Sequence, residues 1–348
     1  MPGSGKKVLG VELAPASVPL ERRLQTLAAF GAFLIFTFGG ATSLIVLIYL
    51  LFGRFWWISF LYAIWYIYDW DSSSRGGHRL QWVRGLRSQK YLRDFFPIKL
   101  HKTAELDPNQ NYIMGYHPHG VMSIGGFNNF GTDATGFPDK FPGIKPYFLT
   151  LKLLHQLPIY REYISAYGVC DVSKESIEYI LRQPTKGNAV VIVIGGAKES
   201  LEANPHHTTD AERIVLLNRK GFVKMALRQG ANLVPVYSFG ENDIYHLVLD
   251  NEPGSRVRKF QRAWQKLFGF APIIFAGRGL FNYNFGMVPY RVPINTVVGK
   301  PIIVEKDPSP SQEKIDNLHE RYMKELRTLF DDHKGKYGYG EQKIEFIE

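Results

Sequence analysis

An uncharged block near the N-terminus restricts most strongly how this chain can fold. Residues 24–53 are 30 consecutive positions without a formal charge, and after Arg54 a second uncharged run of 14 extends from Phe55 to Tyr68. A helix needs about 20 apolar residues to cross the hydrocarbon core of a bilayer, so the first run is long enough and the second is short. We predict a membrane hairpin or re-entrant pair over residues 24–68, bent at Gly39-Gly40 or Gly53-Arg54. A pair of buried core helices is the alternative.

The positive charge of the chain is concentrated next to this block. The 348 residues carry a net charge of +10, and the 34 residues from Asp69 to Lys102 contain eight basic and three acidic side chains, or half of the excess. A basic segment beside an apolar block is typical of the cytosolic face of a membrane. No zinc-finger spacing, basic zipper or aromatic RNA-binding signature is present, so nucleic acid is not expected as a partner. The single cysteine, Cys170, excludes an intramolecular disulfide.

These patterns divide the chain into five segments. We expect a cytosolic N-terminal segment (1–23), the membrane hairpin (24–68), a basic juxtamembrane segment (69–102), a cytosol-facing globular domain (103–333) and a loosely ordered polar tail (334–348). Within the globular domain, β-type runs at 112–116, 189–194, 233–239, 272–276 and 296–304 alternate with amphipathic runs at 159–168, 174–182 and 220–229. This alternation predicts an α/β domain with a largely parallel sheet covered by helices.

Two further helices are predicted from periodicity. Residues 309–312 form a capping box with Pro310 at the first helical position, and apolar residues then follow at helical spacing from Ile315 to Leu329. In the second helix, over 257–268, Val257, Phe260 and Trp264 share one face and basic residues cover the rest. Such a helix either lies in the lipid interface or packs on its own domain.

The densest polar cluster is His117-Pro118-His119-Gly120, directly after the strand predicted at 112–116. Catalytic groups of α/β sheets collect just past the carboxyl ends of strands. A neutral imidazole can remove a proton from an alcohol, Pro118 restricts the backbone, and Gly120 permits close approach. Two His at this spacing also occur in metal sites, although the sequence offers no compact third ligand, and structural His bonded to the loop backbone is a further alternative.

A second glycine-rich segment follows the strand predicted at 189–194. Gly195 and Gly196 can expose backbone N–H groups, and Glu199 brings a carboxylate to the edge of the sheet that carries His119. Together these features indicate a His base oriented by a carboxylate, with backbone donors for an oxyanion. Arg219 and Lys220 begin a basic helix that either neutralises phosphates or forms a solvated face.

Six motifs in order resemble the type 2 diacylglycerol acyltransferase family, which includes the monoacylglycerol acyltransferases. They are Phe95-Phe-Pro-Ile98, His117-Pro-His-Gly120, Gly195-Gly-Ala-Lys-Glu199-Ser, Asn218-Arg-Lys-Gly-Phe222, the run Leu233-Val-Pro-Val-Tyr-Ser-Phe-Gly-Glu241-Asn, and Val297-Val-Gly-Lys-Pro301. The likeness extends from about Pro19 to Tyr339. It implies a glycerolipid-acyltransferase-like mixed sheet flanked by helices, in an endoplasmic-reticulum membrane protein that also occurs on lipid droplets.

The resemblance implies transfer of a fatty acyl group from acyl-CoA, a substrate, to the hydroxyl of an acylglycerol, without a cofactor or a metal. It assigns the essential base to His119 and a supporting role to Glu199. Related glycerolipid acyltransferases place an Asp five positions after the His, where this chain has Ile124, so the partner must come from elsewhere. Many members have Tyr where this chain has Phe95, so a role for that hydroxyl is not carried over.

We therefore predict that His119, aided by Glu199 and His117, activates the hydroxyl of diacylglycerol for direct attack on the thioester. Residues Pro118, Gly120, Gly195, Gly196, Arg219 and Lys220 are the predicted substrate-binding residues. The expected partners are acyl-CoA, mono- or diacylglycerol and membrane lipids, and a homo-oligomer is allowed. Monoacylglycerol is the alternative acceptor, whereas a metal-dependent lipid hydrolase and a non-catalytic membrane-binding protein are the alternative classes.

Overall fold

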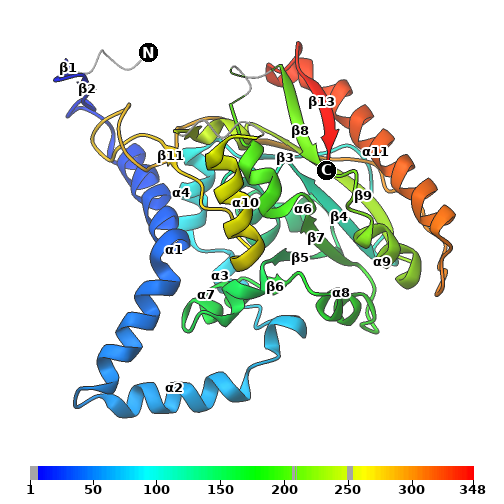
Figure 1. The fold of residues 1–348 in the computed structure, drawn as a ribbon, viewed down its shortest axis with the longest axis horizontal. Helices are drawn as coiled ribbons and strands as arrows, with labels where there is room; N and C mark the ends of the chain where they lie inside the picture. Colours follow the sequence, from blue (N-terminus) through cyan, green and yellow to red (C-terminus); the bar gives the residue numbers. More distant parts are fainter. Residues whose placement is uncertain (1–6, 206–207, 209, 249–253) are drawn as a thin grey trace.

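The computed structural model describes residues 7–205, 208, 210–248 and 254–348. Its centre is a mixed seven-stranded sheet in the order β3-β12-β9-β4-β7-β5-β6 (Figure 1). The strands are β3 (Lys99–Lys102), β12 (Asn295–Val298), β9 (Asn232–Phe239), β4 (Tyr112–His117), β7 (Asn188–Val193), β5 (Lys145–Thr150) and β6 (Cys170–Asp171). The five strands from β9 to β6 are parallel to one another, whereas β12 is antiparallel to β9 and parallel to β3. The α/β class and the mixed sheet are therefore confirmed.

Helices cover both faces of this sheet. On one face α8 (Lys174–Leu181), α9 (Gly221–Gln229) and α11 (Gln312–Lys334) pack against a core that includes Val190, Leu233 and Val297. On the other face α7 (Tyr160–Ala166), α6 (Phe137–Lys140) and the turn η2 (Phe127–Gly131) enclose a second core around Met114 and Val191. Strands β4, β7 and β9 are buried on both sides, which explains their continuous apolar sequences.

The structure corrects two strand predictions and one helix start. The run at 272–276 contributes only β11 (Phe275–Ala276), which pairs with β10 (His246–Leu247) outside the main sheet. The run at 296–304 leaves the ladder after Val298, and Ile302 pairs with Leu233 again as an isolated bridge. Helix α11 begins at Gln312, and the Ser311 hydroxyl accepts a hydrogen bond from the Lys314 N–H at 3.2 Å, so Pro310 precedes the cap.

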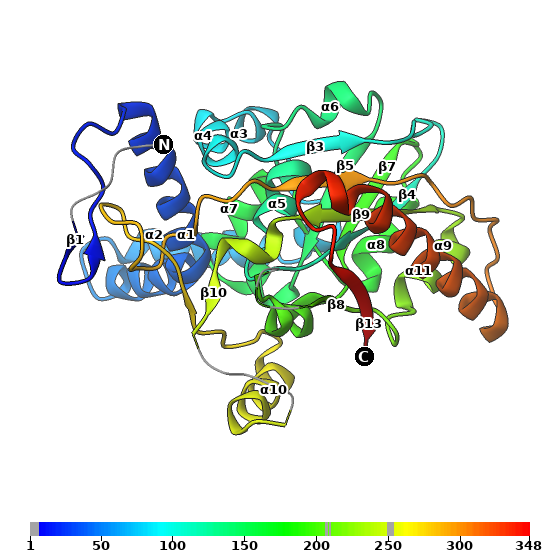
Figure 2. The ribbon, with the colours of Figure 1, turned by 90° about the horizontal axis from the view of Figure 1, so that it is seen from above.

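The C-terminal tail is also more ordered than predicted. Strand β13 (Lys343–Ile347) pairs in parallel with β8 (Ala211–Val215) in a separate two-stranded sheet. The prediction of a loose tail was wrong. Its polar residues alternate with apolar ones, and one of these, Ile344, joins the core beneath α11. This pairing places the end of the chain beside the body of the domain (Figure 2).

The uncharged block forms two helices joined by a sharp bend. Helix α1 (Leu20–Leu51) is continuous through Gly39-Gly40, and the chain turns at Phe52–Phe55 before α2 (Trp56–Tyr68), so the bend lies at the second predicted position. Helix α1 is the one described helix that is long and apolar enough to span a membrane, and only 11% of its most apolar window is buried. The alternative of a buried core helix pair does not fit this exposure.

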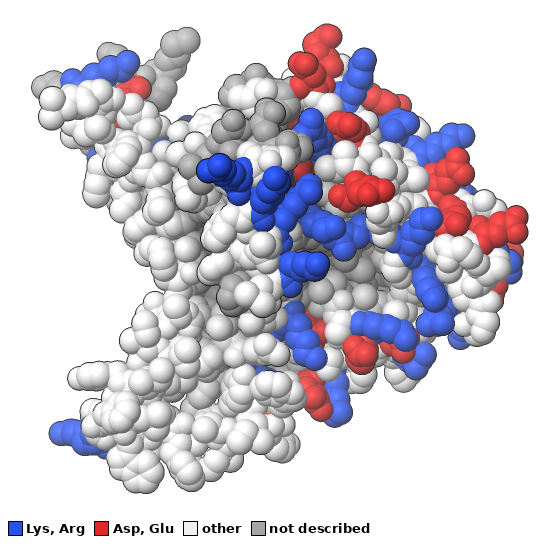
Figure 3. All heavy atoms as spheres, viewed as in Figure 1, with Lys and Arg blue, Asp and Glu red and all other residues white. Residues whose placement is uncertain are grey.

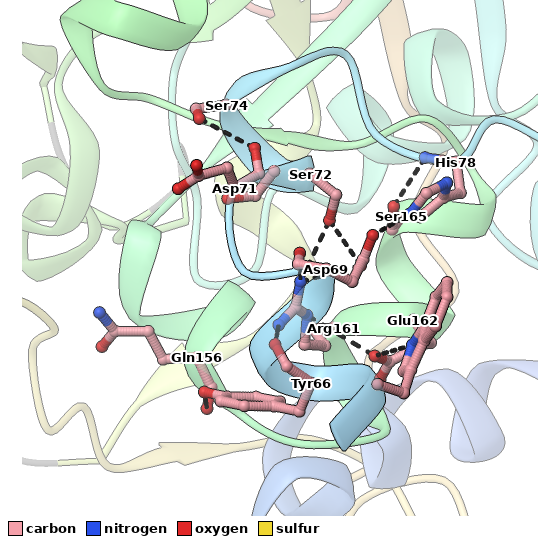
Figure 4. A network of polar contacts seen from close by, with 12 residues as sticks. Tyr66, Asp69, Asp71, Ser72, Ser74, His78, Gln156, Arg161, Glu162 and Ser165 are labelled. Atoms are coloured by element: carbon pink, nitrogen blue, oxygen red, sulfur yellow. Dashed lines mark hydrogen bonds and ion pairs between the residues drawn. The ribbon is translucent and has the colours of Figure 1, made fainter. Parts of the chain in front are cut away.

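Polar contacts attach the two helices to the globular body. The Ser43 hydroxyl donates to the Pro158 carbonyl at 2.6 Å, and the Tyr62 hydroxyl donates to the Glu162 carboxylate at 2.8 Å. Where α2 ends, the buried Arg161 guanidinium pairs with Asp69 at 2.9 Å, as Figure 4 shows. The two helices therefore contact the segment around α7, with α1 along one side of the body and α2 beneath it (Figure 1).

Not all of the basic juxtamembrane segment faces outward. Arg84, one of its eight cations, is fully buried and donates to the carbonyls of Gly131 and Tyr167, both at 2.6 Å. The Arg79 guanidinium donates to the Pro146 carbonyl at 3.0 Å. Part of the charge excess in this segment therefore stabilises backbone turns rather than facing lipid.

Helix α10 (Arg256–Phe268) packs on the domain through a charged side chain and leaves part of its apolar face exposed. It packs through Arg258, which is 3% exposed and pairs with Glu202 at 2.8 Å, whereas Phe260 and Leu267 are 59% and 76% exposed. Figure 2 shows the helix projecting from the body, and Figure 3 shows Lys and Arg side chains gathered on the front of the molecule, beside the largely uncharged α1–α2 region. Contact of α10 with the lipid interface stays a prediction.

Candidate active site

The two polar segments predicted from sequence lie side by side in the structure. Strands β4 and β7 are parallel neighbours, with Tyr116 paired to Val193. The loop that follows β4 carries His119 and Gly120, and the loop that follows β7 carries Gly195 and leads into η4 (Gly196–Glu202). Their shared edge is the expected position for a site in a parallel sheet.

One ring nitrogen of His119 is engaged by the loop, and the other can accept a proton. Its Nδ1–H donates to the carbonyl oxygen of Gly120 at 2.9 Å, which leaves the lone pair on Nε2. The side chain is only half-buried, yet its surroundings lower the pKa of His119 through loss of solvation. The imidazole is therefore neutral at neutral pH and has the protonation state of a general base.

His117 lies in the core instead. It is fully buried, and its Nε2 is 3.1 Å from the Tyr322 hydroxyl of α11, which in turn donates to the Gly115 carbonyl at 3.2 Å. Burial lowers the pKa of His117 to about 3, so the ring stays uncharged. This geometry favours the structural interpretation of His117 over a direct catalytic one.

Glu199 is buried directly beneath the His119 loop. It is 2% exposed, and neither carboxyl oxygen has a well-aligned hydrogen-bond partner in the described part of the chain. Burial raises the pKa of Glu199 well above its usual range, and the nearby His119 backbone N–H and Arg219 oppose that rise. The group that was expected to orient the imidazole therefore does not contact Nδ1, because the loop turns back and supplies the Gly120 carbonyl instead.

The two glycines of the second loop have different reasons to be glycine. A Cβ at Gly195 would lie 1.4 Å from Oε2 of Glu199, so only a residue without a side chain lets the carboxyl fold underneath. Gly196 has open space around it but a φ of +58°, a conformation that glycine adopts readily. The Gly195-Gly196 turn is thus built around Glu199.

Arg219 and Lys220, the two basic residues predicted to bind substrate, make different contacts. The Arg219 guanidinium donates to the Gly195 carbonyl at 3.1 Å, so it borders the site. Lys220 instead pairs with Asp316 of α11 at 2.7 Å. Arg219 is therefore the better candidate for contact with an anionic substrate.

Sequence reasoning missed the role of Glu241, which it quoted only within a motif. This fully buried carboxylate accepts hydrogen bonds from the Tyr116 hydroxyl at 2.7 Å and from the Gly125 N–H at 3.0 Å. A Cβ at Gly120, whose φ is +60°, would lie 2.8 Å from the Glu241 backbone oxygen and Cγ. Burial raises the pKa of Glu241 to about 7. Glu241 thus supports the His119 loop from below, while Pro118 lines a narrow recess beside it.

The residues described here contain no group of three or more His, Cys, Asp or Glu side chains close enough to hold a metal ion together. The His117 and His119 rings are each engaged by a different neighbour, Tyr322 and Gly120. The site that the structure builds is thus a single accessible imidazole on a loop, with a buried carboxyl on either side.

Fold and site together define an α/β protein with an exposed apolar N-terminal helix and a histidine at the carboxyl edge of its sheet. The family model for diacylglycerol acyltransferase matches residues 48–346. The chain therefore belongs to the diacylglycerol acyltransferase family, which confirms the resemblance drawn from the six motifs.

Individual relatives are similar over most of their length. The chain is 45% identical to 2-acylglycerol O-acyltransferase 1 of Bos taurus, covering 96% of this chain and 98% of the relative. It is 47% identical to diacylglycerol O-acyltransferase 2 of Danio rerio, covering 97% and 94%. A crystal structure of the 1-acyl-sn-glycerophosphate acyltransferase PlsC from Thermotoga maritima matches at a TM-score of 0.37 and 12% identity, covering 89% of this chain and 95% of that one.

Proposed function

We propose that this protein is an acyl-CoA-dependent O-acyltransferase that esterifies the free hydroxyl of diacylglycerol to make triacylglycerol. Membership of the family supports the reaction class, and relatives with this activity are 47% identical. The observation that carries the proposal within the structure is the His119 imidazole, neutral and with its Nε2 free of the loop contact that holds Nδ1.

The proposed chemistry is a single displacement. Nε2 of His119 takes the proton of the acylglycerol hydroxyl as the oxygen attacks the thioester carbonyl, and a tetrahedral intermediate forms. Backbone N–H groups near Gly120 or at Gly195-Gly196 would stabilise its oxyanion. The intermediate then expels the CoA thiolate, which recovers the proton from the imidazolium. No acyl group is attached to the enzyme, so capture of an acylated protein would contradict this mechanism.

The proposed setting follows from the α1–α2 pair. These helices expose long apolar side chains while clamping the body at α7, so they would hold the sheet edge at the membrane surface. An acylglycerol can then enter from lipid and the CoA thioester from water. We place the protein in the endoplasmic-reticulum membrane with the globular domain facing the cytosol, and on lipid droplets.

The acceptor is the least constrained part of the proposal, since relatives named for either acceptor have similar identity, 45% and 47%. Microsomes expressing the protein should be given labelled acyl-CoA with diacylglycerol and monoacylglycerol in parallel, using wild type and His119→Ala. We expect triacylglycerol from wild type and a loss of about 10²- to 10⁴-fold in the variant. Faster acylation of monoacylglycerol would reassign the acceptor, whereas retained turnover in His119→Ala would overturn the role of the histidine.

A further inference from the structure

A basic pocket of about 460 Å³ lies at the β3 edge of the sheet, apart from the His119 loop. Its basic side chains come from three parts of the fold. They are His101 and Lys102 of β3, Lys140 of α6, His333 near the end of α11, and Lys336 in η7 (Gly335–Tyr337). These residues come from three separate stretches of sequence. Folding thus brings five basic side chains around one hollow.

The positive charge of the basic pocket is only partly neutralised. Lys102 pairs with Glu105 at 2.6 Å, and Asp139 is the one acidic residue in the lining. No ion pair to Lys140 or Lys336 is found among the residues that the structure describes. Burial lowers the pKa of His101, and the ammonium groups of Lys336, Lys99 and Lys140 lower it further. Several cations therefore act on the same small volume.

Such an arrangement suits an anion with more than one negative charge. A concave surface focuses the field of its charged groups, and ammonium groups converging from different elements can contact several oxygens of one phosphate. The Tyr337 ring lies 5.3 Å from the His101 ring and forms an apolar wall beside the charges. A carboxylate or a halide offers fewer oxygens or charges to these ammonium groups than a phosphate group does.

The position of the basic pocket also separates it from the proposed reaction site. Lys102 is aligned with Val298, Val236 and Tyr116 on successive strands, which puts it about 14 Å from the base of the His119 loop at usual strand spacing. A group bound in the basic pocket would not touch His119. It could belong to a ligand whose other end reaches that loop.

We propose that the basic pocket binds the phosphate or diphosphate group of a ligand. Two sources offer this chemistry, namely the phosphates of CoA and the headgroup of an anionic phospholipid. The binding of phosphate does not depend on the proposed acyl transfer, whereas assignment to CoA rests on it.

The test is calorimetric titration of the full-length protein in detergent with inorganic pyrophosphate, with CoA, and with phosphatidate in mixed micelles. The variant Lys140→Ala/Lys336→Ala removes two charges from the pocket, and Lys174→Ala/Arg182→Ala removes two exposed charges from α8 and its C-cap as a matched control. We expect at least about tenfold weaker binding of pyrophosphate in the pocket variant and no change in the control. Thermal unfolding of both variants checks that they remain folded.

The probes distinguish the sources. A parallel loss of CoA affinity assigns the pocket to CoA, and a loss confined to phosphatidate assigns it to lipid. Failure of wild type to bind any of the three probes, or equal binding by the pocket variant and the control, would overturn the proposal. Because no turnover is measured, inactivity of the enzyme would leave this result unaffected.

Discussion

The loops that follow β4 and β7 begin at the same edge of the sheet, and both contain glycines that their conformations require. They differ in the exposure of their polar side chains. The first loop keeps His119 half-exposed and directs its Nδ1–H into the loop itself. The second loop buries Glu199 completely, with no well-aligned partner for its oxygens among the described residues. We interpret the first loop as the one that presents the proposed base, and the second as a buried support for it.

The means of holding the loops differ as well. Glu241 fixes the first loop by accepting hydrogen bonds from Tyr116 and Gly125. The second loop depends on the close approach of Gly195 to Glu199 and on the Arg219 contact to the Gly195 carbonyl. Substitutions that change only the shape, the hydrogen bonding or the charge of one residue can therefore test what each loop contributes.

Among substitutions that leave His119 in place, the largest effect is expected from Gly195→Ala. The added Cβ would lie 1.4 Å from Oε2 of Glu199, so the carboxyl or the backbone must move beneath His119. A displacement of about 1 Å in a catalytic site can cost on the order of 100-fold in rate, and we expect a loss of that size in kcat. Gly221→Ala is the control, since its Cβ meets open space, and it should keep full activity. An active Gly195→Ala enzyme would show that the second loop is not needed.

Glu241→Ala should have the next largest effect. It leaves the buried Tyr116 hydroxyl and Gly125 N–H without their acceptor, at a cost of about 1–3 kcal/mol in the free energy of unfolding for each group. We expect kcat to fall about tenfold with KM little changed, because the loop loses its position rather than its substrate contacts. Glu241→Gln keeps one acceptor oxygen and should fall between wild type and Glu241→Ala. A loss that appears only in KM would contradict a positioning role.

His117→Gln should affect stability more than rate. The buried ring contacts Tyr322, so its replacement should lower the free energy of unfolding by about 1–3 kcal/mol. Because His117 does not reach the exposed edge of the site, kcat should change by less than about threefold. Thermal unfolding and turnover of the purified variant measure the two effects separately. A drop in kcat comparable with that of His119→Ala would place His117 in the chemistry.

The smallest effect is expected from Glu199→Gln. Burial raises the pKa of Glu199 well above its usual range and so favours the neutral acid, which the amide matches in charge and nearly in shape. We expect kcat at pH 7 within about threefold of wild type. A loss beyond about tenfold would show that an ionised carboxylate is required and would restore the prediction made from sequence.

Much of this comparison was predictable from local sequence patterns. The apolar runs before His117 and Gly195 predict parallel strands whose carboxyl ends meet, and this places His119 near Glu199. Sequence patterns could not distinguish His117 from His119, because burial of His117 depends on Tyr322, 205 residues away. The supporting role of Glu241 could not be predicted for the same reason, since its partners Tyr116 and Gly125 lie on other elements. Helical periodicity could not show that α10 packs through the Arg258 ion pair with Glu202 and leaves Phe260 and Leu267 exposed.

The pH dependence of kcat/KM tests most directly the claim that neutral His119 is the base. A base must be unprotonated, so the rate rises with pH through the pKa of His119, which burial lowers from its usual 6.5. Glu241, with a pKa of about 7, also titrates nearby, so the profile should be measured in wild type and in Glu241→Gln. We predict in both enzymes an acid limb with its midpoint below pH 6.5 and a plateau at pH 7. A midpoint above 6.5 in Glu241→Gln would contradict the account.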